Sequence, residues 1–312
     1  MTNRISYIDA AKGLAILLVI IGHIDTYPII QKFIYSFHMP LFFIISGYFM
    51  NTSMEVGETA KKMYHSTIIP YFVVAIIISS YECIINNSFM QLLTVPLVIW
   101  RFHGNLVSVG AIWFLPALFI GKIWAIWTSN KVNGYYYLLL GALTAIIFTK
   151  VTKIILPFAI EQALIAAPFI LIGSKLREWS IFNRVIRQDI IFSISLALLC
   201  FAPSMSVGMR VISITPYNYV SATLLTIIIV ITLKKIDEID NKIIRLFNYF
   251  FTWCGRYSLI ILCAHSIEAR IGCCNLPHNL FPLEVVIRIT YIIAITWICT
   301  KIKITKKLFC IK

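Results

Sequence analysis

Two apolar stretches near the N-terminus decide the fold: ISYIDAAKGLAILLVIIGH at residues 5–23 and FIYSFHMPLFFIISGYFM at residues 33–50. A helix needs about 20 mostly apolar residues to cross the hydrocarbon core of a bilayer. Similar runs follow along the rest of the chain. Because backbone polar groups find no water inside a membrane, only helices or closed barrels cross it. The runs are continuous and lack the alternation of barrel strands, so the sequence predicts an all-α integral membrane protein.

The composition of the whole chain supports this fold class. Of 312 residues, 60% are hydrophobic and 13% are charged, and the mean hydropathy is +0.87. Soluble domains carry about 25% charged residues. A net charge of +14 would suggest nucleic-acid binding in a soluble protein, but the basic residues here lie between apolar runs. We therefore interpret them as anchors at the lipid bilayer surface and expect no nucleic-acid partner.

The apolar runs predict ten membrane helices. Their ranges are 8–27, 33–50, 66–86, 109–128, 134–149, 158–176, 188–205, 217–234, 254–271 and 283–301. The short apolar segment 89–100 contains Pro96 and is interpreted as re-entrant or interfacial. The longest polar insert, around 234–247, is too short to fold alone. We therefore predict one transmembrane domain over 1–312, with no appended soluble domain.

The placement of lysines and arginines predicts the topology. With ten crossings, most of the 27 basic residues fall on the side that holds both termini. The opposite side carries Lys32, Arg101, Lys150, Lys153, Arg210 and Arg270. Because basic loops remain in the cytoplasm, both termini are predicted to be cytoplasmic.

The first predicted helix contains three ionisable residues, Asp9, Lys12 and His23. Such groups are costly inside a membrane and usually mark function. Eleven helical residues separate Lys12 from His23, so the two lie about 20° apart around the axis and roughly 16 Å apart along it. Asp9 precedes Lys12 by three residues and lies close to the same face. We interpret the three as a ligand site along one face, although each alone could serve in snorkelling, capping or packing.

The second predicted helix adds a polar group beside a proline. His38 is followed by Pro40, which leaves a backbone carbonyl without its helical partner, and then by Ser46 and Tyr48. Elsewhere, Glu161 lies within an apolar run. His265 and Glu268, three residues apart, share one face of the ninth predicted helix.

Glu161 and His265 are candidates for a polar cavity, with helix packing as the alternative for each. The histidines and carboxylates lack ligand spacing on any single helix, so no metal site is expected.

These residues resemble the membrane-bound acyltransferase-3 family of ten-helix O-acyltransferases. The similarity begins at Arg4 and Asp9 and includes a basic residue, ten further residues and a histidine, here Lys12 to His23. The segment from Phe37 to Tyr48 then resembles the family pattern fHmPlFFxiSGy. Weaker matches to the family follow in the expected order along the chain: IIPYF at 68–72, WFLPALF at 113–119, PFILIG at 168–173 and GRYSLIILCAH at 255–265. The compact chain is most similar to the fucose O-acetylase-like branch.

The resemblance implies transfer of an acyl group, expected to be acetyl, from acyl-CoA to a hydroxyl of a cell-envelope carbohydrate or lipid-linked saccharide. The protein would lie in the inner (cytoplasmic) membrane. Acetyl-CoA would be a co-substrate, and no tightly bound cofactor is expected. His23 would act as the general base, or would first accept the acetyl group covalently. Lys12, Lys61 and Lys62 would hold the CoA phosphates, while Asp9 would orient Lys12 or shape the entrance.

The acceptor would lie against a further set of polar side chains. This set comprises His38, Ser46, Tyr48, Glu161 and His265. Two departures from the family are expected to matter. Lys61, Lys62 and His65 stand where the family often has arginines. The chain also ends at Lys312 without the extracytoplasmic hydrolase-like domain of many members, so a second transfer step would need a separate partner.

Two other functional classes also fit a polytopic protein. A transporter or flippase of a lipid-linked saccharide would explain many helices with intramembrane polar groups, but no internal repeat or pair of broken helices is visible. A non-catalytic scaffold would leave the register of Lys12 and His23 unexplained.

Overall fold

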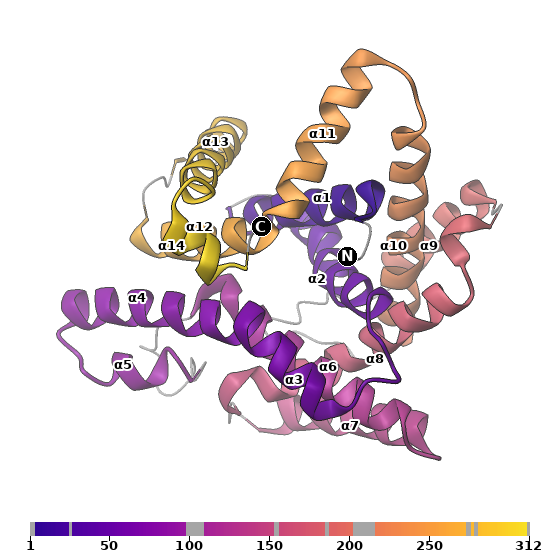
Figure 1. Cartoon of the computed structure of the whole chain (residues 1–312), viewed down its shortest axis with the longest axis horizontal. Coiled ribbons are helices and arrows are strands. Elements are labelled where there is room, and N and C mark those ends of the chain that lie inside the picture. Colours follow the sequence, from indigo (N-terminus) through magenta and orange to yellow (C-terminus); the bar gives the residue numbers. More distant parts are fainter. Residues whose placement is uncertain are drawn as a thin grey trace.

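The computed structural model describes residues 4–24, 27–97, 109–152, 156–184, 187–201, 216–272, 276–277 and 280–310. Within these ranges every regular element is helical (Figure 1). In chain order the elements are α1 (Ser6–Gly22), α2 (Pro28–Tyr48), α3 (Val56–Met63), the π-helical η1 (Tyr64–Ile68), α4 (Ile69–Asn86), α5 (Gln91–Thr94), η2 (Gly110–Trp113), α6 (Phe114–Ser129), α7 (Gly134–Val151), η3 (Pro157–Ala159), α8 (Ile160–Glu178), η4 (Ile181–Asn183), α9 (Gln188–Phe201), α10 (Pro216–Asp237), α11 (Lys242–Arg256), α12 (Ser258–Ile271), α13 (Phe281–Cys299) and α14 (Lys303–Leu308).

Seven helical segments of the described chain are long and apolar enough to cross a membrane. They are Pro28–Tyr48, Val56–Asn86, Gly110–Ser129, Gly134–Val151, Pro157–Glu178, Tyr217–Asp237 and Phe281–Cys299. The other three predicted helices correspond to shorter ones: α1 has 17 residues, while α9 and α12 each have 14. The all-α membrane fold is therefore confirmed, and the count of ten crossings and the location of the termini stay predictions.

The predicted boundaries around residues 234–257 are wrong. We expected a polar insert around 234–247 and a helix that begins at 254. The structure instead has α11 over Lys242–Arg256 and a break at Tyr257 before α12. The Asn241 side chain caps α11 by accepting from the amides of Ile243 and Ile244 at 2.9 and 3.3 Å. The helix was missed because its polar and apolar residues alternate with the helical period, which keeps its average hydropathy low.

Small residues bring the central helices together. A side chain at Gly13 of α1 would collide with the carbonyl of Phe251 in α11, and one at Gly255 would collide with the carbonyl of Asp9. The backbones of α1 and α11 therefore touch. Such close approach at glycine is a common means of packing helices in membranes, where packing and not water exclusion drives association. Helix α1 also contacts α2, α10, α12 and α13, so it lies inside the bundle.

The helix that begins at Val56 runs without interruption to Asn86, but its path changes at η1. Pro70 follows this π-helical turn directly. A proline lacks an amide donor and its ring crowds the carbonyl four residues earlier, and a π-helical turn relieves both problems. The turn directs Ser66 and Thr67 toward the interior of the bundle, as described below.

The short segment after α4 folds back onto the bundle. Tyr71 donates its hydroxyl to the carbonyl of Pro96, and the amide of Phe158 donates to the carbonyl of Leu97 at 2.8 Å. Val95 is buried. These contacts fit the re-entrant alternative for residues 91–97; the remainder of the predicted segment, 98–100, lies outside the described residues.

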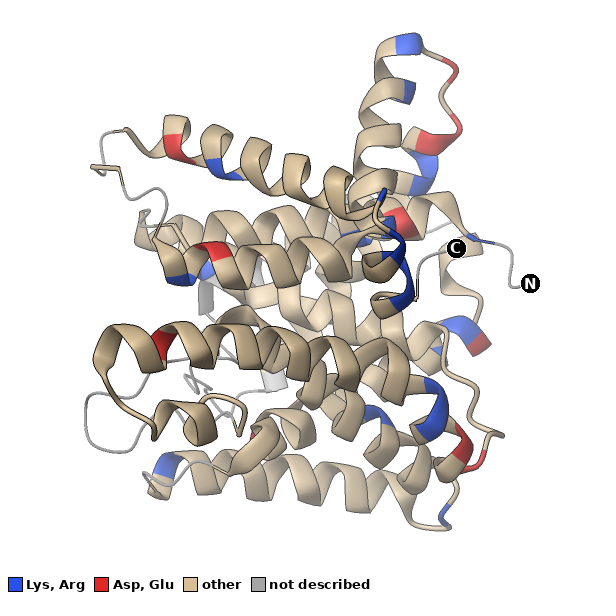
Figure 2. Cartoon of the chain, turned by 60° about the vertical axis from the view of Figure 1, so that its left-hand side comes forward, with Lys and Arg blue, Asp and Glu red and all other residues tan. Residues whose placement is uncertain are grey.

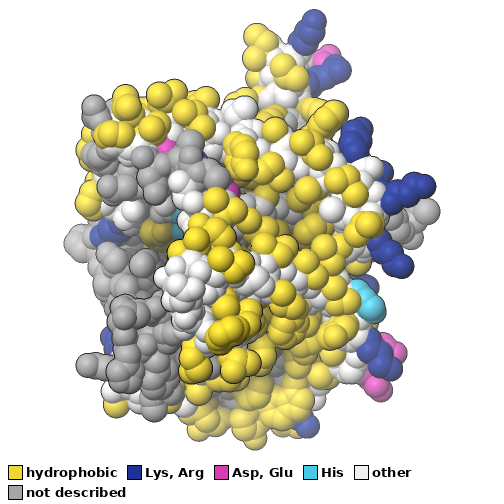
Figure 3. Space-filling view, turned by 90° about the vertical axis from the view of Figure 1, so that its left-hand side faces the viewer, with side chains coloured by type: hydrophobic (Ala, Val, Ile, Leu, Met, Phe, Trp, Pro, Cys, Tyr) yellow, Lys and Arg dark blue, Asp and Glu magenta, His cyan; other side chains and the backbone are white. Residues whose placement is uncertain are grey.

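Charged groups gather at one end of the bundle. Figure 2 shows most lysines and arginines near the end that holds both termini, and Figure 3 shows a broad hydrophobic surface beside it. An apolar flank with a basic end is the arrangement expected of a protein embedded in a bilayer.

Candidate functional site

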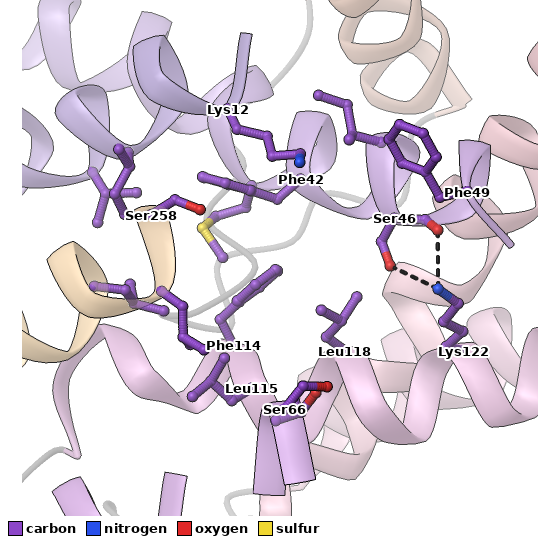
Figure 4. A pocket seen from close by; sticks show the side chains of 17 residues that line it. Lys12, Phe42, Ser46, Phe49, Ser66, Phe114, Leu115, Leu118, Lys122 and Ser258 are labelled. Carbon is purple, nitrogen blue, oxygen red and sulfur yellow. Dashed lines mark hydrogen bonds between the residues drawn. The ribbon is translucent and has the colours of Figure 1, made fainter. Parts of the chain in front are cut away.

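A cavity of about 310 Å³ opens between α1, α2, α6, α12 and η1 (Figure 4). Its apolar walls include Phe42, Phe114 and Leu118. Six residues with a hydroxyl or amino group interrupt this lining: Lys12, Ser46, Ser66, Thr67, Lys122 and Ser258. A mostly apolar cavity with a few polar groups is typical of sites that bind an extended small molecule.

Lys12 enters the cavity from α1 and is paired with Asp9. Its Nζ lies 2.7 Å from the Asp9 carboxylate, one helical turn earlier. The ammonium also lies 5.7 Å from the centre of the Phe49 ring. The spacing of three residues allows this pairing, which is one of the arrangements that the sequence left open for Asp9. The Asp9 carboxylate both orients Lys12 and offsets its charge.

Lys122 is a second cation of the cavity and was not predicted as a site residue. It lies in α6, where its Nζ donates to the Ser46 carbonyl at 3.1 Å and to the Ser46 hydroxyl at 3.3 Å. Among the described residues, no carboxylate forms an ion pair with Lys122. A cation inside a largely apolar run was the signal that could have identified it. Unlike Lys12, it is therefore not offset by a carboxylate of the described chain.

Lys61 and Lys62 are in α3 and are exposed, and neither lines the cavity. The two lysines therefore stand outside the cavity and not within it.

His23 lies just beyond the end of α1, whereas the sequence predicted a helix that continues to residue 27. Its Nδ1 donates to the carbonyl of Val19 at 2.7 Å. Since a carbonyl oxygen only accepts, this bond places the proton on Nδ1 and leaves a lone pair on Nε2. The side chain is accessible. Val19 itself lines the cavity, which therefore reaches the helical turn that holds His23.

His265 lies beside His23, with the ring centroids 5.0 Å apart. It is fully buried, and its Nδ1 lies 3.6 Å from the Glu268 carboxylate. Glu268 in turn lies 3.4 Å from Arg288, which also pairs with Glu284 at 2.9 Å. A row of ionisable groups thus extends from the accessible His23 through buried residues of α12 and α13. Glu284 and Arg288 were not predicted, because only the fold brings α13 against α12.

The other residues proposed for the acceptor side are spread over the bundle. His38 is buried and donates from Nδ1 to the carbonyl of Ile34 at 2.7 Å. Ser46 lines the cavity and holds Lys122. Tyr48 packs its ring 5.1 Å from Phe182, away from the cavity wall. Glu161 is fully buried in the first turn of α8 and does not line the cavity either.

A second hollow of about 210 Å³ adjoins the cavity at Lys12 and Phe49, which line both. Arg4 and Arg256 join Lys12 on its wall, together with Asp9. The hollow therefore carries three cations and one carboxylate. It was not predicted, because Arg256 lies far from α1 in the sequence.

Comparison with known proteins identifies the chain's relatives. Residues 5–301 match the family described as acyltransferase domain, acyltransferase 3. The chain belongs to the acyltransferase-3 family. It is also similar to the nodulation protein NolL of Mesorhizobium japonicum, at 30% identity over 175 residues. That match covers 50% of this chain and 44% of NolL, and no solved structure matches the chain.

In this acyltransferase-3 protein, the candidate site combines polar residues of α1 and α12. Lys12 lies on α1, His23 directly follows that helix, and the His23 ring contacts His265 of α12. The family resemblance had indicated each of these residues. Among the described residues, no three His, Cys, Asp or Glu side chains are grouped as metal ligands.

Proposed function

We propose that this acyltransferase moves an acyl group, expected to be acetyl, from acyl-CoA to a hydroxyl of a cell-envelope carbohydrate in the inner membrane. The cavity is the observation that carries the proposal. It begins at Lys12 and reaches Val19, whose carbonyl orients His23. The cavity therefore leads from Lys12 to the turn of α1 that precedes His23, whose Nε2 keeps a lone pair, although His23 itself does not line the cavity.

The donor would enter from the end with the termini. Its phosphates would lie against Lys12 and Lys122, with Arg4 and Arg256 available to the nucleotide end in the adjoining hollow. Lys61 and Lys62 would attract the donor from outside the cavity, which is a weaker role than direct binding. The pantetheine arm would then follow the apolar wall of α1. The rise of an α-helix separates Lys12 from His23 by roughly 16 Å, which suits such an arm.

His23 would act as the general base. Its Nε2 would take the proton of the acceptor hydroxyl as the oxygen attacks the acyl carbon. The carbon–sulfur bond breaks as the carbon–oxygen bond forms, and the proton passes on to the CoA thiolate. In the alternative order, Nε2 itself attacks the thioester carbon, and the carbon–sulfur bond breaks with CoA leaving as the thiolate. The acceptor oxygen then attacks the acyl-imidazole, the carbon–nitrogen bond breaks, and the hydroxyl proton goes to the CoA thiolate.

The acceptor would approach from the side of His265. Both ring nitrogens of this buried histidine lack a hydrogen-bond partner within the described chain. A buried polar group without a partner is costly, and a sugar hydroxyl could supply the missing bond. The accessible face of His23 would allow a carbohydrate or a lipid-linked saccharide to reach the same point. The reaction needs no metal and no tightly bound cofactor.

The test uses purified protein in lipid nanodiscs with acetyl-CoA and pooled envelope glycans. We expect glycan-dependent release of free CoA from the wild type, and a loss of about 10²- to 10⁴-fold in His23→Ala. The variant should still bind CoA, because His23 is not a phosphate ligand. Undiminished transfer by folded His23→Ala would refute the base assignment. Absence of both turnover and CoA binding in the wild type would refute acyl transfer from CoA and favour transport.

A further inference from the structure

Helix α11 has a sharply divided surface. Its apolar side chains recur at the helical spacing i, i+3, i+4 and i+7: Ile243, Leu246, Phe247 and Phe250. Arg245, Thr252 and Arg256 occupy the opposite side at spacings of seven and four. With 15 residues α11 is also too short to span a bilayer at about 1.5 Å per residue.

Only the second half of α11 is covered by protein. Gly255 and Phe251 touch the backbone of α1, and Cys254 is fully buried. In the first half, Ile243 is 78% exposed, Leu246 71% and Phe247 61%. Neither the bundle nor a neighbouring loop of the described chain covers this apolar stripe.

The helix also differs in direction from the spans. In Figure 2 most long helices cross the view from side to side, whereas α11, topmost in Figures 1 and 2, rises steeply from the bundle. It does so near the end that holds both termini and most of the basic groups. That end is the level at which the headgroups would surround the protein.

We propose that α11 lies in the plane of the membrane at this end, with its apolar stripe among the lipid acyl chains. Lys242 flanks the stripe and Arg245 lies on the polar side of the helix, where both meet the phosphate groups of the phospholipids. Arg245 is 3.4 Å from Asp240, but both side chains are largely exposed, so this ion pair is weak and leaves the guanidinium available. Amphipathic helices with basic and aromatic residues bind membrane surfaces in this way.

The position of α11 links the lipid surface to the donor entrance. Its last turn touches Asp9 and Gly13, the residues that flank Lys12 in the sequence, and Arg256 lines the same hollow as Lys12. A helix held at the headgroups would therefore keep this hollow at the edge of the bilayer. This consequence rests on the proposed function, while the membrane contact of α11 does not.

The first test is thiol labelling in nanodiscs of phosphatidylethanolamine and phosphatidylglycerol that hold one copy each. Leu246→Cys and Arg245→Cys place matched thiols on the two sides of α11, and peptide-resolved mass spectrometry separates them from the native cysteines. A charged maleimide should label Leu246→Cys about tenfold more slowly than Arg245→Cys, because acyl chains exclude it. Equal rates would overturn the proposal. A second copy cannot provide the protection, because each disc holds one.

The second test needs no substitution and so does not depend on how the variants fold. Phospholipids with a photoreactive group in the acyl chain are placed around the wild-type protein in the same nanodiscs. We expect cross-links on the peptide that contains Ile243 to Phe250. Cross-links confined to exposed spans such as α7, with none on α11, would overturn the proposal. Neither readout uses acyl transfer, so failure of the proposed reaction leaves this result unchanged.

Discussion

The imidazole rings of His23 and His265 meet edge to face, with their centroids 5.0 Å apart. One ring is accessible and oriented by a backbone carbonyl, while the other is fully buried beside Glu268. Two adjacent imidazoles with different surroundings can serve different tasks, one as the base and one as a ligand for the acceptor.

His265→Ala tests this division of tasks. We expect the KM for the acceptor to rise by about tenfold or more, because a hydrogen bond to the sugar is worth about 1.5 kcal/mol. The KM for acetyl-CoA should stay unchanged, since His265 does not line the donor cavity. Steady-state kinetics with each substrate varied separately gives both values. An equal rise in the two KM values would point to a general loss of structure.

Lys122→Met should weaken donor binding. The flexible methionine keeps the apolar packing of α6 but removes a charge that no carboxylate of the described residues offsets. A lost hydrogen bond to a charged phosphate costs about 1.5–3 kcal/mol, so the Kd for CoA should rise by about 10- to 100-fold. The measurement is CoA binding in detergent or nanodiscs by calorimetry.

Lys131→Met is the matched control for this prediction. Lys131 is exposed and lies over the ring of Trp127, outside the cavity. The Lys131→Met variant should bind CoA with the same Kd as the wild type. Unchanged binding in Lys122→Met would mean that the phosphates lie elsewhere.

Arg288→Ala should destabilise the protein strongly. Arg288 pairs with two buried carboxylates, Glu268 and Glu284. Removal of one partner from a buried charge group costs about 3–5 kcal/mol, because the remaining charges stay unpaired. Thermal unfolding of the purified protein measures the effect. Addition of Glu268→Gln and Glu284→Gln should recover part of the loss, and a neutral effect of Arg288→Ala would contradict the network.

The sequence was sufficient for the fold class and for the relative positions of the polar residues along α1. Long apolar runs identify spans regardless of tertiary contacts, and the spacing from Lys12 to His23 lies within one helix, where geometry follows from the helical repeat alone. The ion pair of Asp9 and Lys12 is local in the same sense. These features need no knowledge of which helices are neighbours.

What the sequence could not provide depends on helix packing. Arg288 meets Glu268 only because α13 lies against α12, and Lys122 meets Ser46 only because α6 lies near α2. Hydropathy averaged along the chain also hides α11, whose signal is periodic. Donor binding by Lys61 and Lys62 was inferred from resemblance alone, and both remain outside the cavity.

Gly13→Ala tests the backbone contact that joins α1 to α11. The added methyl group would collide with the carbonyl of Phe251, so α11 would have to move away from α1. We expect a lower melting temperature and weaker CoA binding, because Lys12 and Arg256 line one hollow across this contact. Gly57→Ala is the control, since no atom lies within 4 Å of the new methyl group. That control should be neutral or stabilise α3 by about 0.5–1 kcal/mol. If both variants have the same melting temperature as the wild type, the close approach of α1 and α11 is not present in the membrane.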